Sequence, residues 1–477
     1  KRDKIMLTSA FTLSILAMAF SRYSSTSVLN GENITSSVVY FGGLIIFMIC
    51  AFNIVYKYNK SNEKEKLNFD YSLIISISFI FISVLAARSG VRFTMVLVPM
   101  ASVMSGYLIF LACINAIKAK EKKNVFVIIL AVIVVLAGLY TANYSYQVSK
   151  AQAENFYPSS YNVQWQYAMG WVRDNTPENA VFAHWWDYGY WVQSIGKRAT
   201  VLDGGNYIVY WNHLMGRHVL TGTDDNLALE FLKTHKATHL LIDSTDLGKY
   251  SAYSSIGGDE SNDKISFFPS FFIDTSLTQE TKTGLTYIYA GGANLDDDII
   301  FNINGSSVTL AKENTILGGI LIDEDKSGEF KQPRAVFIQQ NKQIQIPLRY
   351  FYYNNKLIDF NEGLEAGFFV YQTITPQQNG GLSADDKGTG YYLSPRTVNS
   401  LVVRKYLFGE EKNFKLVHTE LHPVVTSLRS QGFNASEFIY VQGNFFGPIK
   451  IWEINYPEEI NENPEFLLTD YPDERLR

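Results

Sequence analysis

The sequence predicts an α-helical transmembrane region, followed by a mixed α/β extracytoplasmic core and then by one or more β-rich appended domains. Three observations support this fold class. Apolar runs crowd the first 142 of the 477 residues, helical and strand-like patterns then alternate, and short strand-like runs punctuated by glycine fill the remainder. We place the domains at 1–142, 143–290 and 291–477.

Five apolar segments in the first domain have the composition of membrane spans. They are 5–20, 38–57, 70–87, 91–117 and 124–142. A bilayer core of about 30 Å requires about 20 predominantly apolar residues. The first segment is short and the third is marginal, whereas the last contains no charged residue. Because such segments repeat and no cleavage site follows the first, we do not predict a signal peptide. The chain begins with Lys1 rather than Met, so we expect it to be the C-terminal portion of a longer protein.

The placement of basic residues predicts the orientation of these spans. Eleven Lys and Arg residues lie before the first span and in the loops after the second and fourth, whereas Arg22, Arg88 and Arg92 lie on the other side. Cytoplasmic loops carry the excess of Lys and Arg. We therefore expect a multi-pass integral membrane protein in which everything after residue 142 lies outside the cytoplasm.

The domains after residue 142 differ from the spans in charge and cysteine content. Residues 1–142 hold 14 of the 41 basic and 6 of the 46 acidic residues, so the remainder has a net charge near −13. This excess of acid argues against a nucleic-acid partner, which would require a basic surface. Cys50 and Cys113, the only cysteines, both lie in predicted spans, so no disulfide framework stabilises the outer domains.

The outer part begins with an aromatic connector at 144–161 and continues with alternating elements. We predict helices at 164–174 and 224–233, and strands at 180–183, 198–202 and 238–242. Later strands are predicted at 286–289, 299–303 and 335–338, and a polar loop or linker at 377–390. The alternation to about residue 290 predicts an α/β core, and parallel α/β sheets place their sites where the strands end.

The run His184-Trp-Trp-Asp-Tyr-Gly-Tyr-Trp191 follows the first of these strands. It holds three of the seven tryptophans of the chain around Asp187. Tryptophan offers an apolar face and one N–H donor, while an ionised carboxylate only accepts hydrogen bonds. Such a group suits a small hydroxyl ligand. The alternative is an aromatic core strand with a buried, satisfied Asp, since aromatic residues dominate protein cores.

The motif Trp185-Trp186-Asp187-Tyr188-Gly189 resembles the W-W-D-Y-G signature of oligosaccharyltransferase catalytic subunits of the archaeal single-subunit type. The resemblance also covers the spans, the run W-x-x-A-M-x-W-V-R-x-N-T-P at 165–177, and the core to about residue 260. After 290 it holds only in general character. It implies a glycosyltransferase that moves an oligosaccharide from a dolichyl or polyprenyl (pyro)phosphate carrier to Asn in Asn-x-Ser/Thr sequences.

The resemblance assigns recognition of the Ser/Thr hydroxyl to Trp185, Trp186 and Asp187, with Tyr188 and Gly189 holding the turn. A site built to bind a hydroxyl rejects an analogue that lacks it by about 10⁴-fold.

A second motif contributes to the same task by resemblance. The family has an Asp, a Lys six residues later and then an apolar residue, which Asp243, Lys249 and Ile256 match. Asp246 stands where the family often has Met, so Ile256 or Tyr253 is left to contact the threonine methyl. Without the resemblance, the segment reads as a strand that ends in an Asx turn and a surface lysine.

Three further residues are assigned by resemblance to the lipid carrier and the metal. Arg92, and with it Arg88, would bind the carrier phosphate, although an interfacial arginine that snorkels to the headgroups is the alternative. The family uses Mn²⁺ or Mg²⁺, and we expect most of its ligands upstream of this chain. Glu32 is the one carboxylate in the outer loop at 21–37, either as a metal ligand or as an ordinary loop residue.

The expected partners are a lipid-linked oligosaccharide, acceptor protein segments with Asn-x-Ser/Thr, and membrane lipids, in an archaeal plasma membrane. Two other functions remain open on sequence. One is another multispan lipid-sugar-dependent transferase of the O-mannosyltransferase type, which would need no Trp-Trp-Asp pocket. The other is a non-enzymatic, membrane-anchored module that binds sugar or peptide.

Overall fold

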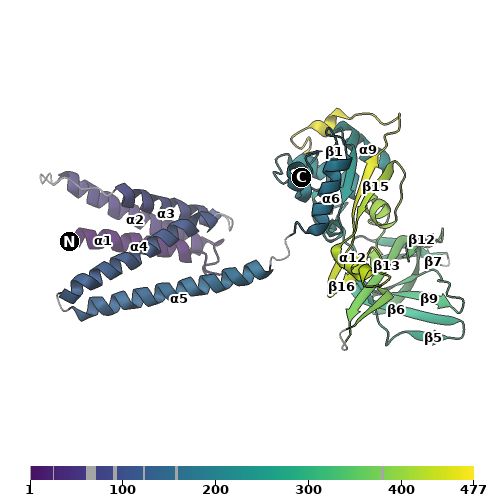
Figure 1. The fold of residues 1–477 in the computed structure, drawn as a ribbon, viewed down its shortest axis with the longest axis horizontal. Helices are drawn as coiled ribbons and strands as arrows, with labels where there is room; N and C mark the ends of the chain where they lie inside the picture. Colours follow the sequence, from purple (N-terminus) through teal and green to yellow (C-terminus); the bar gives the residue numbers. More distant parts are fainter. Residues whose placement is uncertain are drawn as a thin grey trace. The chain divides into compact units, whose positions relative to one another are not determined.

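The computed structural model describes residues 2–24, 26–60, 71–89, 94–121, 124–155, 160–303, 305–377 and 381–476. The chain divides into two compact units, Lys1–Tyr157 and Pro158–Arg477 (Figure 1). The predicted order of a helical membrane region, an α/β core and a β-rich part is confirmed.

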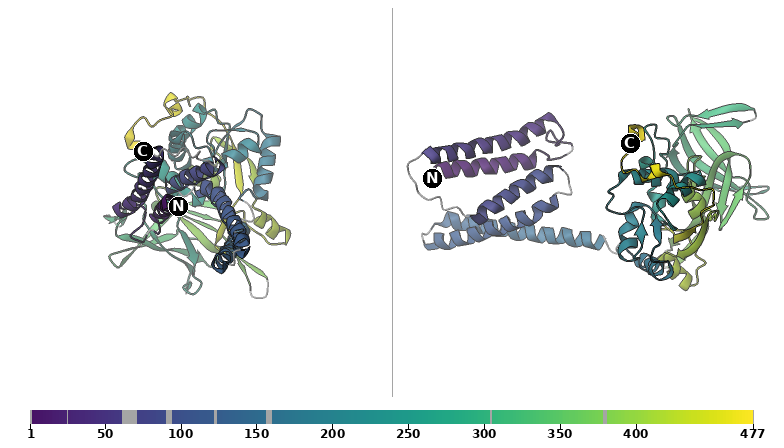
Figure 2. Two further views of the ribbon diagram at one scale, coloured as in Figure 1. Left: turned by 90° about the vertical axis from the view of Figure 1, so that its left-hand side faces the viewer. Right: turned by 90° about the horizontal axis from the view of Figure 1, so that it is seen from above.

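The first unit consists of helices, one for each predicted span. They are α1 (Arg2–Phe20), α2 (Ile34–Lys60), α3 (Tyr71–Ser89), α4 (Thr94–Glu121) and α5 (Val125–Asn155). Within the unit, α1 packs on α2, α3 on α4, and α4 on α5 (Figure 2). A Cβ atom on Gly43 would lie 2.7 Å from the Ala17 Cβ, so the α1–α2 contact needs a residue without a side chain there.

Three of these helices contain a stretch that is long and apolar enough to cross a membrane, namely Ile34–Asn53, Met95–Ala119 and Val125–Asn155. Thr8–Phe20 and Ser78–Ala87 are shorter apolar helices. The chain is therefore a membrane protein. Helix α5 continues past the predicted end of its span, so the connector predicted at 144–161 is helical as far as Asn155. The physical reason is that 143–155 contains neither Gly nor Pro and nothing interrupts the helix.

A five-stranded sheet forms the α/β part of the second unit. It consists of β1 (Val181–Ala183), β2 (Ala199–Thr200), β3 (His239–Ile242), β15 (Phe414–Glu420) and β18 (Ile449–Ile454), in the order β15-β18-β3-β1-β2. Strand β1 is parallel to both neighbours, since Phe182 pairs with Thr200 on one side and with His239 on the other. Strand β18 pairs antiparallel with β3, and β15 with β18. The three predicted strands are confirmed, and two C-terminal strands extend their sheet.

Helices connect these strands and cover the sheet. They are α6 (Val163–Asn175), α7 (Gly189–Ser194), α8 (Val209–Leu214), α9 (Asp225–Thr234), α10 (Thr245–Gly248) and α11 (Tyr250–Ile256). A 3₁₀ turn spans Trp186–Tyr188 and a π-helical segment spans Met215–Leu220. The predicted helices at 164–174 and 224–233 appear as α6 and α9. Helix α6 begins where the Asn162 side chain accepts a hydrogen bond from the Trp165 N–H.

A larger sheet forms the β-rich part and lies beside the α/β part (Figures 1 and 2). Its strands are β4 (Ser270–Ile273), β5 (Gln279–Thr281), β6 (Gly284–Asn294), β9 (Thr315–Asp325), β10 (Arg334–Gln339), β11 (Lys342–Tyr353), β12 (Lys356–Asp359), β13 (Leu364–Pro376), β14 (Leu382–Leu393), β16 (Ile439–Val441) and β17 (Asn444–Phe446). Its order is β12-β11-β10-β9-β6-β4-β14-β13-β16-β17. Strand β11 also pairs with β13, which closes the sheet on itself.

Smaller elements complete the second unit. A separate hairpin joins β7 (Ile299–Ile303) to β8 (Ser306–Leu310), and α12 (Pro423–Ser430) precedes β16. Short helical segments span Val403–Leu407, Pro464–Leu467 and Glu474–Leu476.

The predicted loop at 377–390 was wrong from residue 382 onward. These residues form β14, which pairs with β13 and β4. The glycines and acidic residues that suggested a loop are accommodated because ladder hydrogen bonds and packing outweigh local propensity.

Candidate functional site

The WWDYG segment forms the tight connection between β1 and α7. After Ala183 the chain enters the 3₁₀ turn Trp186–Tyr188, and α7 begins at Gly189. Gly189 lies against the connection that follows β2. A Cβ atom there would come within 2.7 Å of the Asp203 Cβ and 2.8 Å of the Leu202 carbonyl oxygen. Only glycine fits, so this close packing fixes the position of the turn.

The aromatic residues of the motif differ in their burial and in the rings that they contact. Trp185 is buried, with its ring centroid 5.7 Å from that of Tyr253, whereas Trp186 is half-buried. Tyr188 stacks on Trp165 of α6 at 4.7 Å, and Trp165 meets Trp191 edge-on at 4.8 Å. The motif therefore contains one buried tryptophan, Trp185, and aromatic rings that pack against Trp165. The sequence alone did not distinguish these two environments.

Asp187 and Lys249, the polar residues predicted from the two motifs, form an ion pair. The Lys249 Nζ lies 2.8 Å from the Asp187 Oδ2, and the two side chains keep 31% and 28% of their exposure. Lys249 also donates to the Tyr188 hydroxyl at 2.9 Å and lies 4.5 Å from its ring centroid. Since β1 and β3 are parallel neighbours, their ends bring residues 187 and 249 together. Both charged groups remain accessible to a ligand.

Behind this pair lies a buried hydrogen-bond network built on Asp246. The Tyr188 hydroxyl donates to the Asp246 Oδ1 at 2.8 Å, and the Asp243 N–H donates to the Asp246 Oδ2 at 3.0 Å. Asp243 in turn accepts from the Thr245 N–H and hydroxyl at 2.8 and 2.6 Å. Asp246 thus positions Tyr188, and through it Lys249. In the sequence, Asp246 was visible only as a departure from the family pattern.

Burial dominates the electrostatics of this network. It raises the pKa of Asp246 to about 7 and raises the pKa of Asp243. The pKa of the Tyr188 hydroxyl lies well above its usual value, first through burial and then through the nearby carboxylates. At the start of the motif, the His184 Nδ1–H donates to the Trp185 carbonyl at 2.7 Å, and burial lowers the His184 pKa to about 4. His184 is therefore neutral at pH 7.

The raised pKa of Asp246 predicts a pH dependence of stability. An unfolded Asp titrates near ~3.9, whereas folded Asp246 titrates at about 7, so the folded state holds the proton more tightly. The free energy of unfolding should therefore fall as the pH rises from 4 to 7. Asp246→Asn should remove this part of the fall.

The measurement is thermal unfolding at pH 5 and pH 8, followed by tryptophan fluorescence. All seven tryptophans belong to the second unit, so the signal reports on that unit. The exposed Asp297→Asn serves as the matched control and should retain the pH dependence of the parent. Equal pH dependence in the parent and Asp246→Asn would contradict the role given to burial.

A cavity of about 660 Å³ opens beside the Asp187–Lys249 pair. It is lined by Ser160, Asn162, Gln164, Trp165, Asp187, Tyr188, Trp191, Asp243, Ser244, Thr245, Lys249, His422, Asn444, Phe445 and Phe446. One part is charged and hydroxyl-rich, and another is aromatic. Its volume lies within the ~300–1,000 Å³ that is usual for ligand pockets. Sequence reasoning missed the contributions of Gln164, His422 and 444–446, which carry no motif.

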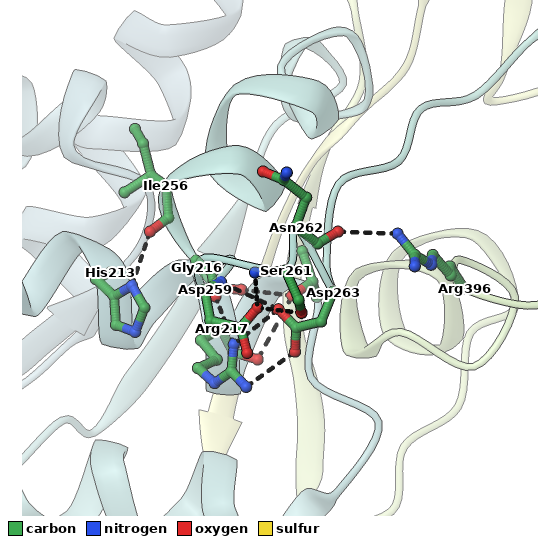
Figure 3. Close-up of polar contacts among 11 residues, drawn as sticks. His213, Gly216, Arg217, Ile256, Asp259, Ser261, Asn262, Asp263 and Arg396 are labelled. Atoms are coloured by element: carbon green, nitrogen blue, oxygen red, sulfur yellow. Dashed lines mark hydrogen bonds and ion pairs between the residues drawn. The ribbon is translucent and has the colours of Figure 1, made fainter. Parts of the chain in front are cut away.

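Other predicted recognition residues do not line this cavity as the described residues define it. Trp185 is buried just before the 3₁₀ turn, Trp186 is half-buried at its first position, and Ile256 lies at the end of α11. The Ile256 carbonyl accepts a hydrogen bond from the His213 Nδ1–H at 2.8 Å (Figure 3). Figure 3 also shows the Ile256 side chain directed away from His213. Tyr253 is fully buried against Trp185.

The predicted residues of the first unit are placed only in part. Arg92 lies outside the described residues, and of Arg88 only the backbone, at the end of α3, is described. Glu32 is exposed in the turn between α1 and α2, where its N–H donates to the Asn30 Oδ1 at 2.9 Å. With Arg22, it is among the residues that line a cavity of about 310 Å³.

Glu32 alone does not make a metal site. Within the described ranges, no three or more His, Cys, Asp or Glu side chains are grouped so that they could hold a metal ion. Among the described residues, Glu32 is therefore a single candidate ligand and not a complete Mn²⁺ or Mg²⁺ site.

Comparison with known proteins relates the chain to one group of enzymes. No family model matches it. It is 26% identical over 250 residues to dolichyl-phosphooligosaccharide-protein glycotransferase 1 of Pyrococcus furiosus, a match that covers 50% of this chain and 24% of that protein. It is 24% identical to glycotransferase 3 of Archaeoglobus fulgidus, covering 36% and 23%, and 24% identical to the undecaprenyl-diphosphooligosaccharide-protein glycotransferase of Campylobacter jejuni, covering 35% and 21%.

These matches span about a quarter of the length of each relative. Among solved structures, the apo Archaeoglobus fulgidus oligosaccharyltransferase aligns with 64% of this chain and 33% of its own at 16% identity, with a TM-score of 0.33. By sequence the chain is similar to these archaeal and bacterial oligosaccharide–protein glycotransferases, and it carries the motif WWDYG at 185–189.

Proposed function

We propose that the protein is an oligosaccharyltransferase that moves an oligosaccharide from a dolichyl or polyprenyl (pyro)phosphate carrier to Asn in Asn-x-Ser/Thr segments. In this reaction the bond from the sugar to the carrier phosphate breaks, a bond from the sugar to the Asn amide nitrogen forms, and that nitrogen loses one proton. The observation that carries the proposal is the Asp187–Lys249 pair, 2.8 Å apart beside the cavity.

The chemistry of this pair suits a hydroxyl. An ionised carboxylate only accepts hydrogen bonds and an ammonium only donates them, whereas a hydroxyl does both. The Ser or Thr hydroxyl would donate to Asp187 and accept from Lys249, which a methyl group cannot do. The pair is partly exposed, so separating its two charges costs only about 0–1 kcal/mol. Recognition through Asp187 and Lys249 therefore depends on the hydroxyl.

The lipid and metal assignments extend the proposal to the first unit. Arg92 and Arg88 would bind the carrier phosphate, to which arginine can donate two hydrogen bonds at once. Transfer would require Mn²⁺ or Mg²⁺, with Glu32 as one candidate ligand. The protein would be a multi-pass protein of the archaeal plasma membrane, with the second unit outside the cytoplasm.

The test is transfer by the full-length protein in membranes with lipid-linked oligosaccharide, Mn²⁺ and a fluorescent Asn-x-Thr peptide. We expect a glycopeptide that requires both the Asn and the Thr and that disappears on chelation. Sugar attached to the hydroxyl of a peptide without Asn would favour an O-mannosyltransferase type instead. Peptide binding without any product would favour a binding module.

A further inference from the structure

The cavity beside Asp187 and Lys249 extends to the end of the large sheet, where it is lined by the edge strand β17. We propose that the acceptor segment next to the hydroxyl-bearing residue binds there in extended form and pairs with β17 as an added β-strand. This inference rests on the proposed function, because the Asp187–Lys249 pair sets the position of the segment.

Two observations place an open strand edge at the cavity. Strand β17 is the last strand in the order of its sheet and is paired with β16 on one side. Asn444, Phe445 and Phe446 all line the cavity. Successive side chains of a strand point to opposite faces, so three consecutive lining residues indicate that the cavity borders the strand edge rather than one face.

The register of the β16–β17 hairpin determines which backbone groups are available. Its two-residue turn has φ values of 48° at Gln442 and 88° at Gly443, as in a type I′ turn. The Val441–Asn444 pair closes this turn, and in a two-residue hairpin the closing pair is the hydrogen-bonded one. The next pair, Tyr440–Phe445, is then a non-hydrogen-bonded pair. The N–H and C=O of Phe445 therefore point away from β16, as strand addition requires.

Hydrogen bonds and ring contacts within the chain hold the edge strand in place. Gln164, which is 2% exposed, donates through its Nε2 to the Gly447 carbonyl at 3.1 Å and to the Glu420 carbonyl at 2.8 Å. The Phe445 ring packs 5.0 Å from Tyr371, and the Phe446 ring stacks on His422 at 4.4 Å. A preformed edge does not have to be ordered on binding, which favours affinity.

The walls of the cavity define the class of segment that fits. Burial lowers the pKa of His422 to about 4, so His422 is neutral at pH 7 and contributes an aromatic face. Trp165, Trp191 and Phe446 add further aromatic surface. Three strand residues span roughly 10 Å. The occupant is thus an extended acceptor segment of about three residues flanking the Ser/Thr, with apolar or aromatic side chains favoured over charged ones.

Disulfide capture on the full-length protein tests this placement. The two cysteines of this sequence, Cys50 and Cys113, belong to the first unit, so Asn444→Cys introduces a thiol at the exposed start of β17. Acceptor peptides carry one Cys at successive positions on either side of the Thr. We expect capture at alternate positions. Lys356→Cys, in the edge strand β12 at the other end of the same sheet, is the matched control and should capture none.

A second arm uses peptides N-methylated at one flanking amide at a time. Methylation of an amide that pairs with Phe445 should lower transfer by about 2- to 10-fold, the effect of losing one hydrogen bond, and methylation of its neighbours should not. The inference is overturned if transfer depends on the Thr hydroxyl but capture at Asn444→Cys equals that at Lys356→Cys. A disulfide-linked dimer of Asn444→Cys chains that excludes peptide would also overturn it. If the parent protein transfers sugar equally well to a peptide that lacks the Thr hydroxyl, the proposed function is refuted instead.

Discussion

Replacing Asp187 with alanine is expected to reduce glycopeptide formation by about 10⁴-fold in kcat/KM. The variant removes the acceptor that would receive the Ser/Thr hydroxyl proton, and a site built to bind a hydroxyl loses discrimination of this size without its polar partner. Lys249 keeps its hydrogen bond to Tyr188 at 2.9 Å, so the cavity wall should stay in place. The measurement is the rate of transfer to an Asn-x-Thr peptide.

Asp174→Ala is the matched control for this experiment. Asp174 is also a carboxylate in an ion pair, with Arg173 at 2.8 Å, but it lies on the exposed end of α6. Its removal should leave the rate within about twofold of the parent, as for most surface ion pairs. A rate for Asp187→Ala close to that of Asp174→Ala would exclude Asp187 from recognition.

Gly189→Ala is expected to destabilise the second unit by about 3 kcal/mol, because the added methyl group has no room. It would come within 2.7 Å of the Asp203 Cβ and 2.8 Å of the Leu202 carbonyl oxygen, part of which is rigid backbone. The turn that carries Asp187 would have to move, so transfer should fall as well. The measurement is denaturant unfolding followed by tryptophan fluorescence.

Gly170→Ala tests whether crowding, and not the loss of glycine as such, causes this effect. Gly170 lies within α6, and a Cβ atom there would meet nothing within 4 Å. In a helix this change should stabilise by about 0.5–1 kcal/mol. Opposite signs for the two variants are therefore expected. Similar small effects would show that the Gly189 turn can adapt.

The sequence predicted those parts of the second unit that are encoded locally. Short apolar runs marked β1 and β3, and the family resemblance assigned Asp187 and Lys249 to one task. The structure shows these two side chains in contact. Strands β15 and β18 could not be assigned to the same sheet, because nothing local in 414–454 specifies β3 as the pairing partner. Strand β14 was missed because its glycines and acidic residues have low strand propensity, which pairing with β13 overrides.

The residues of the candidate site divide in the same way, into those that a local motif marks and those that only the fold brings together. Asp187 and Lys249 lie in motifs, whereas the wall formed by His422 and 444–446 comes from segments far along the chain. Asp246 was noticed only as a residue out of pattern. Its position beneath Tyr188 depends on the packing of α10 against the WWDYG turn, which no spacing of residues reveals.

The most direct test of hydroxyl recognition combines one change in the peptide with one change in the protein and measures all four combinations. Transfer is measured for Asn-x-Thr and for the same peptide with 2-aminobutyrate, which keeps the methyl group of threonine but lacks its hydroxyl, using the parent and Asp187→Asn. The parent should prefer threonine by about 10³-fold or more, and Asp187→Asn should lose most of that preference. An undiminished preference in Asp187→Asn would contradict the assignment of the hydroxyl to the Asp187–Lys249 pair.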